Sequence, residues 1–422
     1  MKLTEFQRTR LARKRFAKRI ARQGRERVDR SRFAELLDKA AARELSDLQE
    51  ELGGSITYDN ILRRHLPETT RYLLEHPESE FAWKRIESID RWRMDTFKVP
   101  EVFSLIDEPS IAYEFLRQVL WALLKSGRQR LLFDYEGCKQ LDIGAQVVLD
   151  IIIKDVIQLY DRCNRRPKLL KTLGVVKKIG LTNIIQTRQS NEAVLKILYS
   201  VGSPAIHTNA HLHFADLEPY ELNIYKPPED TFHLDQQQGD AIETTKLVTY
   251  VQRCLRRVGK RLVGDEETNL YKTISEILIN ASEHSSVRTR YSIGYFQDDG
   301  DHGAHSGNFR LVILNFGRTI YEKFKDPNCP NKKVVAKMSE LSDKYQSRQW
   351  FRKSEFEEET LWTLYALQEG VTSTSPDEYE GRGNGSIQFI KSFLELNGSA
   401  SAARSRNSRM NIVSGRTLLR FD

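Results

Sequence analysis

The sequence predicts a multidomain α/β protein, and three observations support that class. The chain has 422 residues, which exceeds the usual size of one domain. It is 39% hydrophobic and 29% charged, as globular proteins typically are. Short apolar runs typical of strands, at 131–133 and 311–314, alternate with longer segments of helical periodicity. We therefore expect helices packed on sheets.

The composition and the apolar runs also indicate in which cellular compartment the protein is expected. The best candidate for a membrane span, 147–157, is interrupted by Asp150, Lys154 and Asp155. The basic N-terminal segment lacks the apolar core of a secretory signal. The four cysteines lie far apart without a CxxC pair, which favours reduced thiols over disulfides or a zinc site. We expect a cytoplasmic protein with no membrane partner.

Positive charge is concentrated in a basic arm, residues 1–30. This arm has twelve Lys and Arg against three acidic residues, which leaves about −1 of the total +8 for the rest of the chain. Its apolar residues do not share one helical face, so neither a core helix nor a membrane-surface helix is expected. Two interpretations stay open: a solvated arm, or electrostatic contact with nucleic acid or another polyanion.

Residues 31–125 are predicted to form a helical region. Apolar residues follow helical spacing after Ser31, which suits a helix N-cap, and the Gly53–Gly54 pair suits its end. The remainder of the region, 56–125, has mostly helical character interrupted by prolines. The sequence indicates no chemistry in this region.

The segment 126–235 is predicted to form an α/β domain. A strand at 131–133 precedes a turn near Gly137 and a helix from about Ala145. The order of strand, acidic turn, "LDIGA" and helix resembles the STAS domains of anti-sigma-factor antagonists. In that family a serine often follows the aspartate and is phosphorylated, whereas Ile143 follows Asp142 here, so this domain is not expected to be such a substrate. A generic α/β layer is the alternative.

The stretch "EILINASEHSS" carries the first indication of chemistry. In a helix from about Glu267, apolar residues spaced by three and four predict a core face: Leu270, Ile274, Ile277, Leu278 and Ala281. A polar stripe, Glu276, Asn280, Glu283 and His284, lies on the opposite side. Glu276 and Asn280 are one turn apart. On its own, such a stripe is usually the solvated face of a helix.

Two glycine motifs follow this helix. "RLVILNFGRTI" is a strand that runs into a sharp loop containing Asn315, Gly317 and Thr319. In "EGRGNGSIQFIKSFLELNGSASAARS", three glycines come directly before a predicted helix: Gly381, Gly383 and Gly385. Glycines at that position let backbone N–H groups approach a phosphate, which the helix dipole also favours.

The three motifs, in this order, resemble the GHKL superfamily of ATP-binding domains, which includes gyrase B, MutL and the histidine kinases. The resemblance covers 236–422 and implies an α/β sandwich that binds ATP. It implies that Glu276 is the catalytic residue, which orients or deprotonates the attacking water or hydroxyl. It implies that Asn280 ligates Mg²⁺. Mg²⁺ prefers oxygen ligands and keeps several waters, so one carboxamide oxygen plus phosphates suffices, and a carboxylate one turn away suits a general base.

The resemblance also assigns nucleotide contacts. These are Asn280, Asn315, Gly317, Thr319, Gly381, Gly383, Gly385 and Thr417. The family normally has Asp where Asn315 stands, and glycine where Thr319 stands. Asn315 still offers an acceptor oxygen to an adenine amino group, at a cost of about 1 kcal/mol in affinity.

Residues from about 321 to 380 correspond to the lid over ATP. Helices are predicted there at 334–345 and 357–369. The segment is either an insertion that packs within the domain or a nucleotide-sensitive contact surface.

A Mg²⁺-dependent ATPase that acts as a nucleotide-gated regulatory switch is the expected function. Histidine kinases usually lack an acid at the position of Glu276, and the chain has no phosphoacceptor block, so that activity is disfavoured. The expected partner is an unidentified protein, and a homodimer in the ATP-bound state is expected by resemblance. One alternative is a serine/threonine protein kinase of the anti-sigma-factor type. The other is a non-hydrolysing nucleotide sensor that contacts nucleic acid through residues 1–30.

Overall fold

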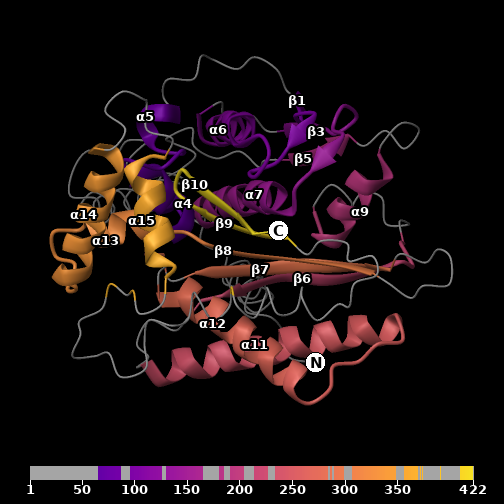
Figure 1. Ribbon diagram of the computed structural model, residues 1–422. Coiled ribbons are helices and arrows are strands. Elements are labelled where there is room, and N and C mark those ends of the chain that lie inside the picture. The colour runs from indigo at the N-terminus through magenta and orange to yellow at the C-terminus, as the bar shows by residue number, and fades with distance from the viewer. Residues whose placement is uncertain are drawn as a thin grey trace, which may run out of the picture. The chain divides into compact units, whose positions relative to one another are not determined.

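The computed structural model describes most of the chain beyond residue 64 (Figure 1). The described residues are 65–86, 96–125, 130–164, 180–184, 191–203, 213–226, 233–283, 286–287, 289–298, 307–347, 356–368, 371, 373, 390 and 409–421. The basic arm, 1–30, lies outside them. The chain divides into two compact units, 1–66 with 159–176 and 67–158 with 177–422. The contacts discussed below all lie in the second unit.

The first half of this unit is built around parallel strands. β1 (Thr96–Lys98), β3 (Arg130–Asp134) and β5 (Gly180–Ile184) form one parallel sheet in that order. β2 (Val102–Phe103) pairs in parallel with β4 (Gln140–Leu141). The helices are α4 (Glu68–Glu75), α5 (Trp83–Ile86), α6 (Pro109–Lys125), α7 (Ile143–Asn164) and α9 (Glu192–Ser200). Parallel strands require crossover connections, which α6 and α7 provide.

The parallel strands differ from the sequence prediction in one respect. β1 and β2 lie within 31–125, where the sequence predicts helices, and they pair with strands of the predicted 126–235 domain. A boundary at residue 126 therefore divides a sheet. Strands of two and three residues are too short to show an alternating pattern, and their partners lie more than 30 residues away.

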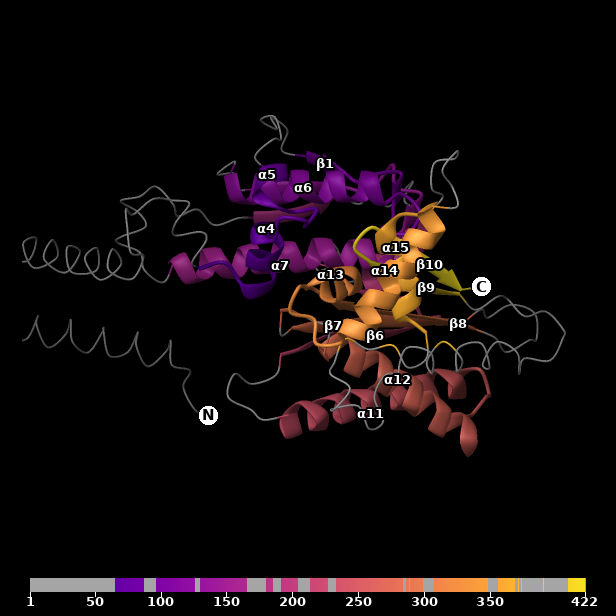
Figure 2. The same ribbon diagram turned by 60° about the vertical axis from the view of Figure 1, so that its left-hand side comes forward.

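The second half contains an antiparallel sheet covered by two long helices. β6 (Leu217–Tyr225), β7 (Arg290–Asp298) and β8 (Gly307–Asn315) pair in that order. α11 (His233–Arg257) and α12 (Asp265–Glu283) lie along one face of this sheet in both views (Figures 1 and 2). The buried core between them contains Leu247, Val248, Ile274 and Leu278. The last two belong to the predicted core face of α12, and their burial agrees with that prediction. β6 belongs to this sheet although it precedes residue 236.

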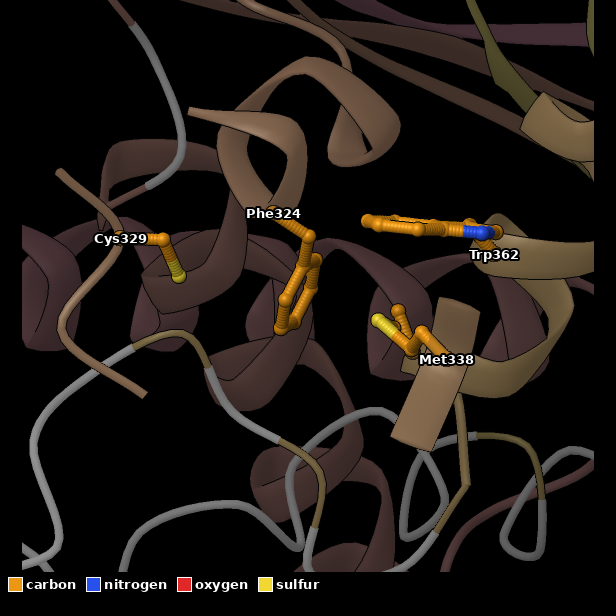
Figure 3. Close-up of a cluster of buried hydrophobic side chains, with 5 residues drawn as sticks. Phe324, Cys329, Met338 and Trp362 are labelled. Atoms are coloured by element: carbon orange, nitrogen blue, oxygen red, sulfur yellow. The ribbon is translucent and has the colours of Figure 1, made fainter. Parts of the chain in front are cut away.

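Three further helices form a bundle with its own core. α13 (Ile320–Lys325), α14 (Lys332–Ser347) and α15 (Glu358–Ala366) enclose buried Phe324, Cys329, Met338, Trp362 and Ala366 (Figure 3). The helices predicted at 334–345 and 357–369 correspond to α14 and α15. A C-terminal hairpin follows, made of β9 (Met410–Ser414) and β10 (Thr417–Phe421). None of the helices in the described part of the chain is long and apolar enough to cross a membrane.

Candidate functional site

The C-terminal half of α12 holds Glu276 and Asn280. The first two turns of this helix are largely exposed, whereas no residue from 273 to 282 is. Glu276 and Asn280 are both half-buried and lie one helical turn apart. Glu276 and Asn280 are therefore partly shielded from solvent, unlike the first two turns of the same helix.

The carboxamide of Asn280 is incompletely hydrogen-bonded. Its Nδ2 atom is buried and has no hydrogen-bond partner in the described structure. A buried polar group left unpaired costs about 1–3 kcal/mol, so it calls for an explanation such as a ligand. The nitrogen and oxygen of a carboxamide exchange places when the group flips. Asn280 can thus offer a donor and an acceptor to a ligand with oxygen atoms and a cation.

The loop after β8 is fastened to the end of α12. The Nδ2 atom of Asn315 donates to the carbonyl of Ala281 at 3.0 Å. The Val287 N–H donates to the carbonyl of Phe316 at 3.0 Å, and the Arg318 N–H donates to the Ser286 hydroxyl at 2.9 Å. Gly317 lies between these two attachments. The structure therefore brings Asn315 to the helix that carries Glu276 and Asn280, and Gly317 lies between two residues that are bound to 286 and 287, just beyond the end of that helix.

Thr319 begins α13 as its N-cap. Its hydroxyl accepts a hydrogen bond from the Glu322 N–H at 3.1 Å, and the Glu322 carboxylate accepts one from the Thr319 N–H at 2.7 Å. This reciprocal pair is a capping box, which satisfies backbone donors at a helix start. It explains why a residue with a side-chain hydroxyl stands at this position. The nucleotide contact assigned to Thr319 stays a prediction.

Thr417 lies against the bundle formed by α13, α14 and α15. It is buried at the start of β10, with its hydroxyl 3.2 Å from that of Thr360 in α15. The same hairpin is bound twice more, because Glu359 accepts from the Arg416 N–H at 3.1 Å and the Ile320 N–H donates to the Ser414 hydroxyl at 3.0 Å. The hairpin is thus attached to α15 and to the start of α13.

The second glycine motif, Gly381, Gly383 and Gly385, lies outside the described residues. Ile390, a helical residue five positions after it, is described and buried. It belongs to an apolar cluster that includes Ile277 of α12 and Ile320 of α13. Ile277 is adjacent to Glu276 in the chain. The helical residue just beyond the glycines therefore packs near the same part of α12.

The sequence argument did not identify Arg290, the first residue of β7. Its buried guanidinium pairs with Asp240 and Glu243 of α11 and also binds α12. The sequence does contain an indication of this ion pairing. Asp240 and Glu243 are spaced by three on an otherwise amphipathic helix, and Arg290 stands at the start of an apolar strand. Pairing them requires knowing which strand faces which helix.

Asp142, the aspartate of the STAS-like motif, has a structural role. It accepts hydrogen bonds from the Leu105 N–H at 3.2 Å and from the Gly144 N–H at 3.1 Å. Burial raises the pKa of this carboxyl above its usual value, although these bonds act in the opposite direction. Ile143, which follows Asp142, is buried at the start of α7.

Comparison of the chain with protein-family models, curated proteins and solved structures found no match. Within the described residues, no group of three or more His, Cys, Asp or Glu side chains could hold a metal ion. A magnesium site with Asn280 as its protein ligand is of another kind, because phosphate and water oxygens complete the coordination.

Proposed function

We propose that the C-terminal part of the chain, 236–422, binds Mg²⁺–ATP and hydrolyses it as a nucleotide-gated switch. The observation that carries this proposal is the unpaired, buried amide of Asn280, one turn from Glu276 on a half-buried length of α12. The attachment of the loop at 315–319 to the same helix end supports it.

Each residue has a defined task in this proposal. Asn280 contributes its carbonyl oxygen to Mg²⁺ and its N–H to a ligand oxygen. Glu276 orients the attacking water and accepts its proton. Asn315, whose Nδ2 is committed to Ala281, presents its carbonyl oxygen to an amino group such as that of adenine. Bound Mg²⁺ supplies neutralisation of the phosphate charge, which together with positioning is most of what phosphoryl transfer requires.

The switch follows from the position of the lid bundle. α13 begins three residues after Gly317, so a change in the loop moves the start of the bundle. The bundle also contacts the C-terminal end of α4, because Glu322 Oε1 lies 3.5 Å from Nε2 of His76, the C-cap of that helix. We propose that nucleotide binding alters how this bundle meets a protein partner or a second copy of the chain, and that the protein acts in the cytoplasm.

The test compares wild type with Asn280→Ala, Glu276→Gln and Glu267→Gln. Glu267 is exposed on the first turn of the same helix, so its variant controls for removal of a carboxylate. We expect Mg²⁺–ATP binding to be lost in Asn280→Ala. We expect Glu276→Gln to bind ATP but to release phosphate at least ~100-fold more slowly, since general acid–base catalysis contributes about 10²–10⁴-fold. Glu267→Gln should match wild type in calorimetric binding and phosphate release.

Other outcomes separate the alternatives. Absence of ATP binding by the wild type contradicts the proposal, and so does equal turnover by Glu276→Gln and Glu267→Gln. Binding with transfer of the γ-phosphate to a protein, instead of release, favours the serine/threonine kinase. Binding without release or transfer favours the nucleotide sensor, whose salt-dependent contact with nucleic acid should then require residues 1–30.

A further inference from the structure

Arg290 joins β7 to both helices from a buried position. Only 1% of its side chain is exposed. Its Nη1 atom donates to Asp240 Oδ1 at 2.7 Å and to the carbonyl of Leu278 at 2.7 Å, and it also contacts the hydroxyl of Ser282. Its Nη2 atom pairs with Glu243. One guanidinium thus holds α11 through two carboxylates and α12 through a carbonyl and a hydroxyl.

The two sides of this cluster differ in what they hold. The α11 side consists of Asp240 and Glu243, and Ser292 of β7 donates to Glu243 at 2.5 Å. The α12 side consists of the Leu278 carbonyl and the Ser282 hydroxyl, and this hydroxyl also donates to Asp240 Oδ1 of α11 at 3.2 Å. These acceptors come two residues before and two residues after Asn280. Arg290 therefore contacts α12 both before and after Asn280 in the chain, the residue proposed to ligate Mg²⁺.

A buried ion cluster of this kind is poorly explained by stability alone. Burying charges carries a desolvation penalty that their mutual attraction often fails to exceed, and well-packed apolar residues frequently serve as well. What a guanidinium adds is direction, because its N–H groups form a rigid fork. Here that fork contacts the last two turns of α12, at the Leu278 carbonyl and the Ser282 hydroxyl.

We propose that Arg290 is a positioning residue for the proposed magnesium–nucleotide site. It holds the turn 278–282 so that the Asn280 carboxamide is set before the ligand arrives, and it does not touch the ligand itself. Small displacements of such a group have large effects on function. This inference rests on the proposed function, because the geometry of Asn280 matters to binding only if Mg²⁺–ATP binds there.

The test uses the two serines of the cluster as a matched pair. Ser282→Ala removes the α12 hydroxyl that contacts both Arg290 and Asp240, and Ser292→Ala removes the β7 hydroxyl that binds only Glu243 of α11 among the cluster's acids. Arg290→Lys keeps the charge and removes the fork. The measured quantity is the ratio of ATP affinity in Mg²⁺ to that in EDTA, and the melting temperature is recorded for each variant. We expect the ratio to fall about tenfold in Ser282→Ala and further in Arg290→Lys, but to stay within about twofold in Ser292→Ala.

Each result has a definite meaning. An unchanged ratio in Ser282→Ala and Arg290→Lys, despite lower melting temperatures, shows a merely structural cluster and overturns the inference while the proposed function stands. An equal loss in Ser292→Ala also overturns it. If Arg290→Lys does not fold, the serine pair decides. A wild-type protein without Mg²⁺-dependent ATP binding overturns the proposed function and this inference together.

Discussion

The side chain of Asn315, at the end of β8, donates a hydrogen bond to the carbonyl of Ala281 in α12 at 3.0 Å. The bond joins a strand end to the residue directly after Asn280. It requires a donor at position 315, which an ionised aspartate cannot supply. The asparagine at position 315 is therefore matched to a contact within this chain.

Asn315→Asp should consequently weaken the protein. A carboxylate would face the Ala281 carbonyl, and the lost bond should cost about 1–3 kcal/mol of unfolding free energy. We also expect weaker Mg²⁺–ATP binding, because the end of α12 loses its attachment to β8. Denaturant unfolding and calorimetry measure the two effects. Asn411→Asp, at an exposed site on β9, is the control; tighter ATP binding by Asn315→Asp would contradict the argument.

Gly415→Ala should weaken the attachment of the C-terminal hairpin to the bundle formed by α13, α14 and α15. Gly415 has a φ of 59°, and a Cβ there would lie 2.8 Å from Thr319 Cγ2 and closer still to Glu359 Oε1. Moving Glu359 breaks its bond with the Arg416 N–H. Gly202→Ala is the control, because its φ of 63° carries the same strain but no atom lies within 4 Å of the added Cβ. Both variants lose about 1 kcal/mol to backbone strain, and Gly415→Ala should lose about 1 kcal/mol more in denaturant unfolding. Equal losses would show that the hairpin is not held by Glu359.

Thr70→Val should be destabilising because Thr70 binds a buried carboxylate. The Thr70 hydroxyl donates to Asp155 Oδ2 in α7 at 2.8 Å, and its N–H donates to the same oxygen at 3.3 Å. Thr70 is fully buried and Asp155 is 8% exposed. Loss of the hydroxyl should cost about 1–3 kcal/mol. Thr70→Ser keeps the hydroxyl and should cost clearly less in thermal unfolding, so equal losses in the two variants would contradict a dominant role for the hydroxyl bond.

Asp150 should make stability depend on pH. Burial raises the pKa of this carboxyl to about 7, although Gln146 and Ser203 hydrogen-bond to it and act in the opposite direction. The ordinary value is about 3.9, so the folded protein binds an extra proton between about pH 4 and pH 7. The contribution to stability is fully present below about pH 4 and is lost as the pH rises through about 7.

Asp150→Asn removes this titration and keeps an acceptor for Gln146. We expect the variant to gain stability relative to wild type between pH 5 and pH 8, on the order of 1–2 kcal/mol, since one pKa unit corresponds to about 1.4 kcal/mol. Urea unfolding at both pH values measures it. Glu136→Gln, which replaces an exposed carboxylate, should follow wild type. A parallel decline in wild type and Asp150→Asn would assign the pH dependence to other groups.

The long periodic elements could be predicted from the sequence, and the contacts between them could not. Helical spacing indicated α12, α14 and α15 and the core residues Ile274 and Leu278. β1 and β2 were missed because their pairing depends on strands far along the chain. The capping box of Thr319 was readable from "TIYE", in which threonine and glutamate stand three apart.

The sequence indicates the spacing of the proposed site residues but not the contacts around them. The spacing of Glu276 and Asn280 follows from the helix period alone. The unpaired amide of Asn280 and the Asn315–Ala281 bond depend on how β8 meets α12, which no local pattern encodes. The Arg290 cluster is a stronger example, because Asp240 and Arg290 stand 50 residues apart.

The hydrogen bond between Thr69 and Tyr291 has a consequence for synthesis of the chain. These hydroxyls meet at 2.9 Å in a buried contact, although 222 residues separate them. Arg420 of β10 similarly donates to the carbonyl of Ile106, across 314 residues. α4 therefore leaves the ribosome long before β7 is synthesised. Until then, the side of α4 that carries Thr69 lacks its contact with Tyr291. Contacts of such long range slow folding and expose apolar surface in the interval. The unit reaches its native packing only after β10 has been made, so its folding is completed after translation of the last strand.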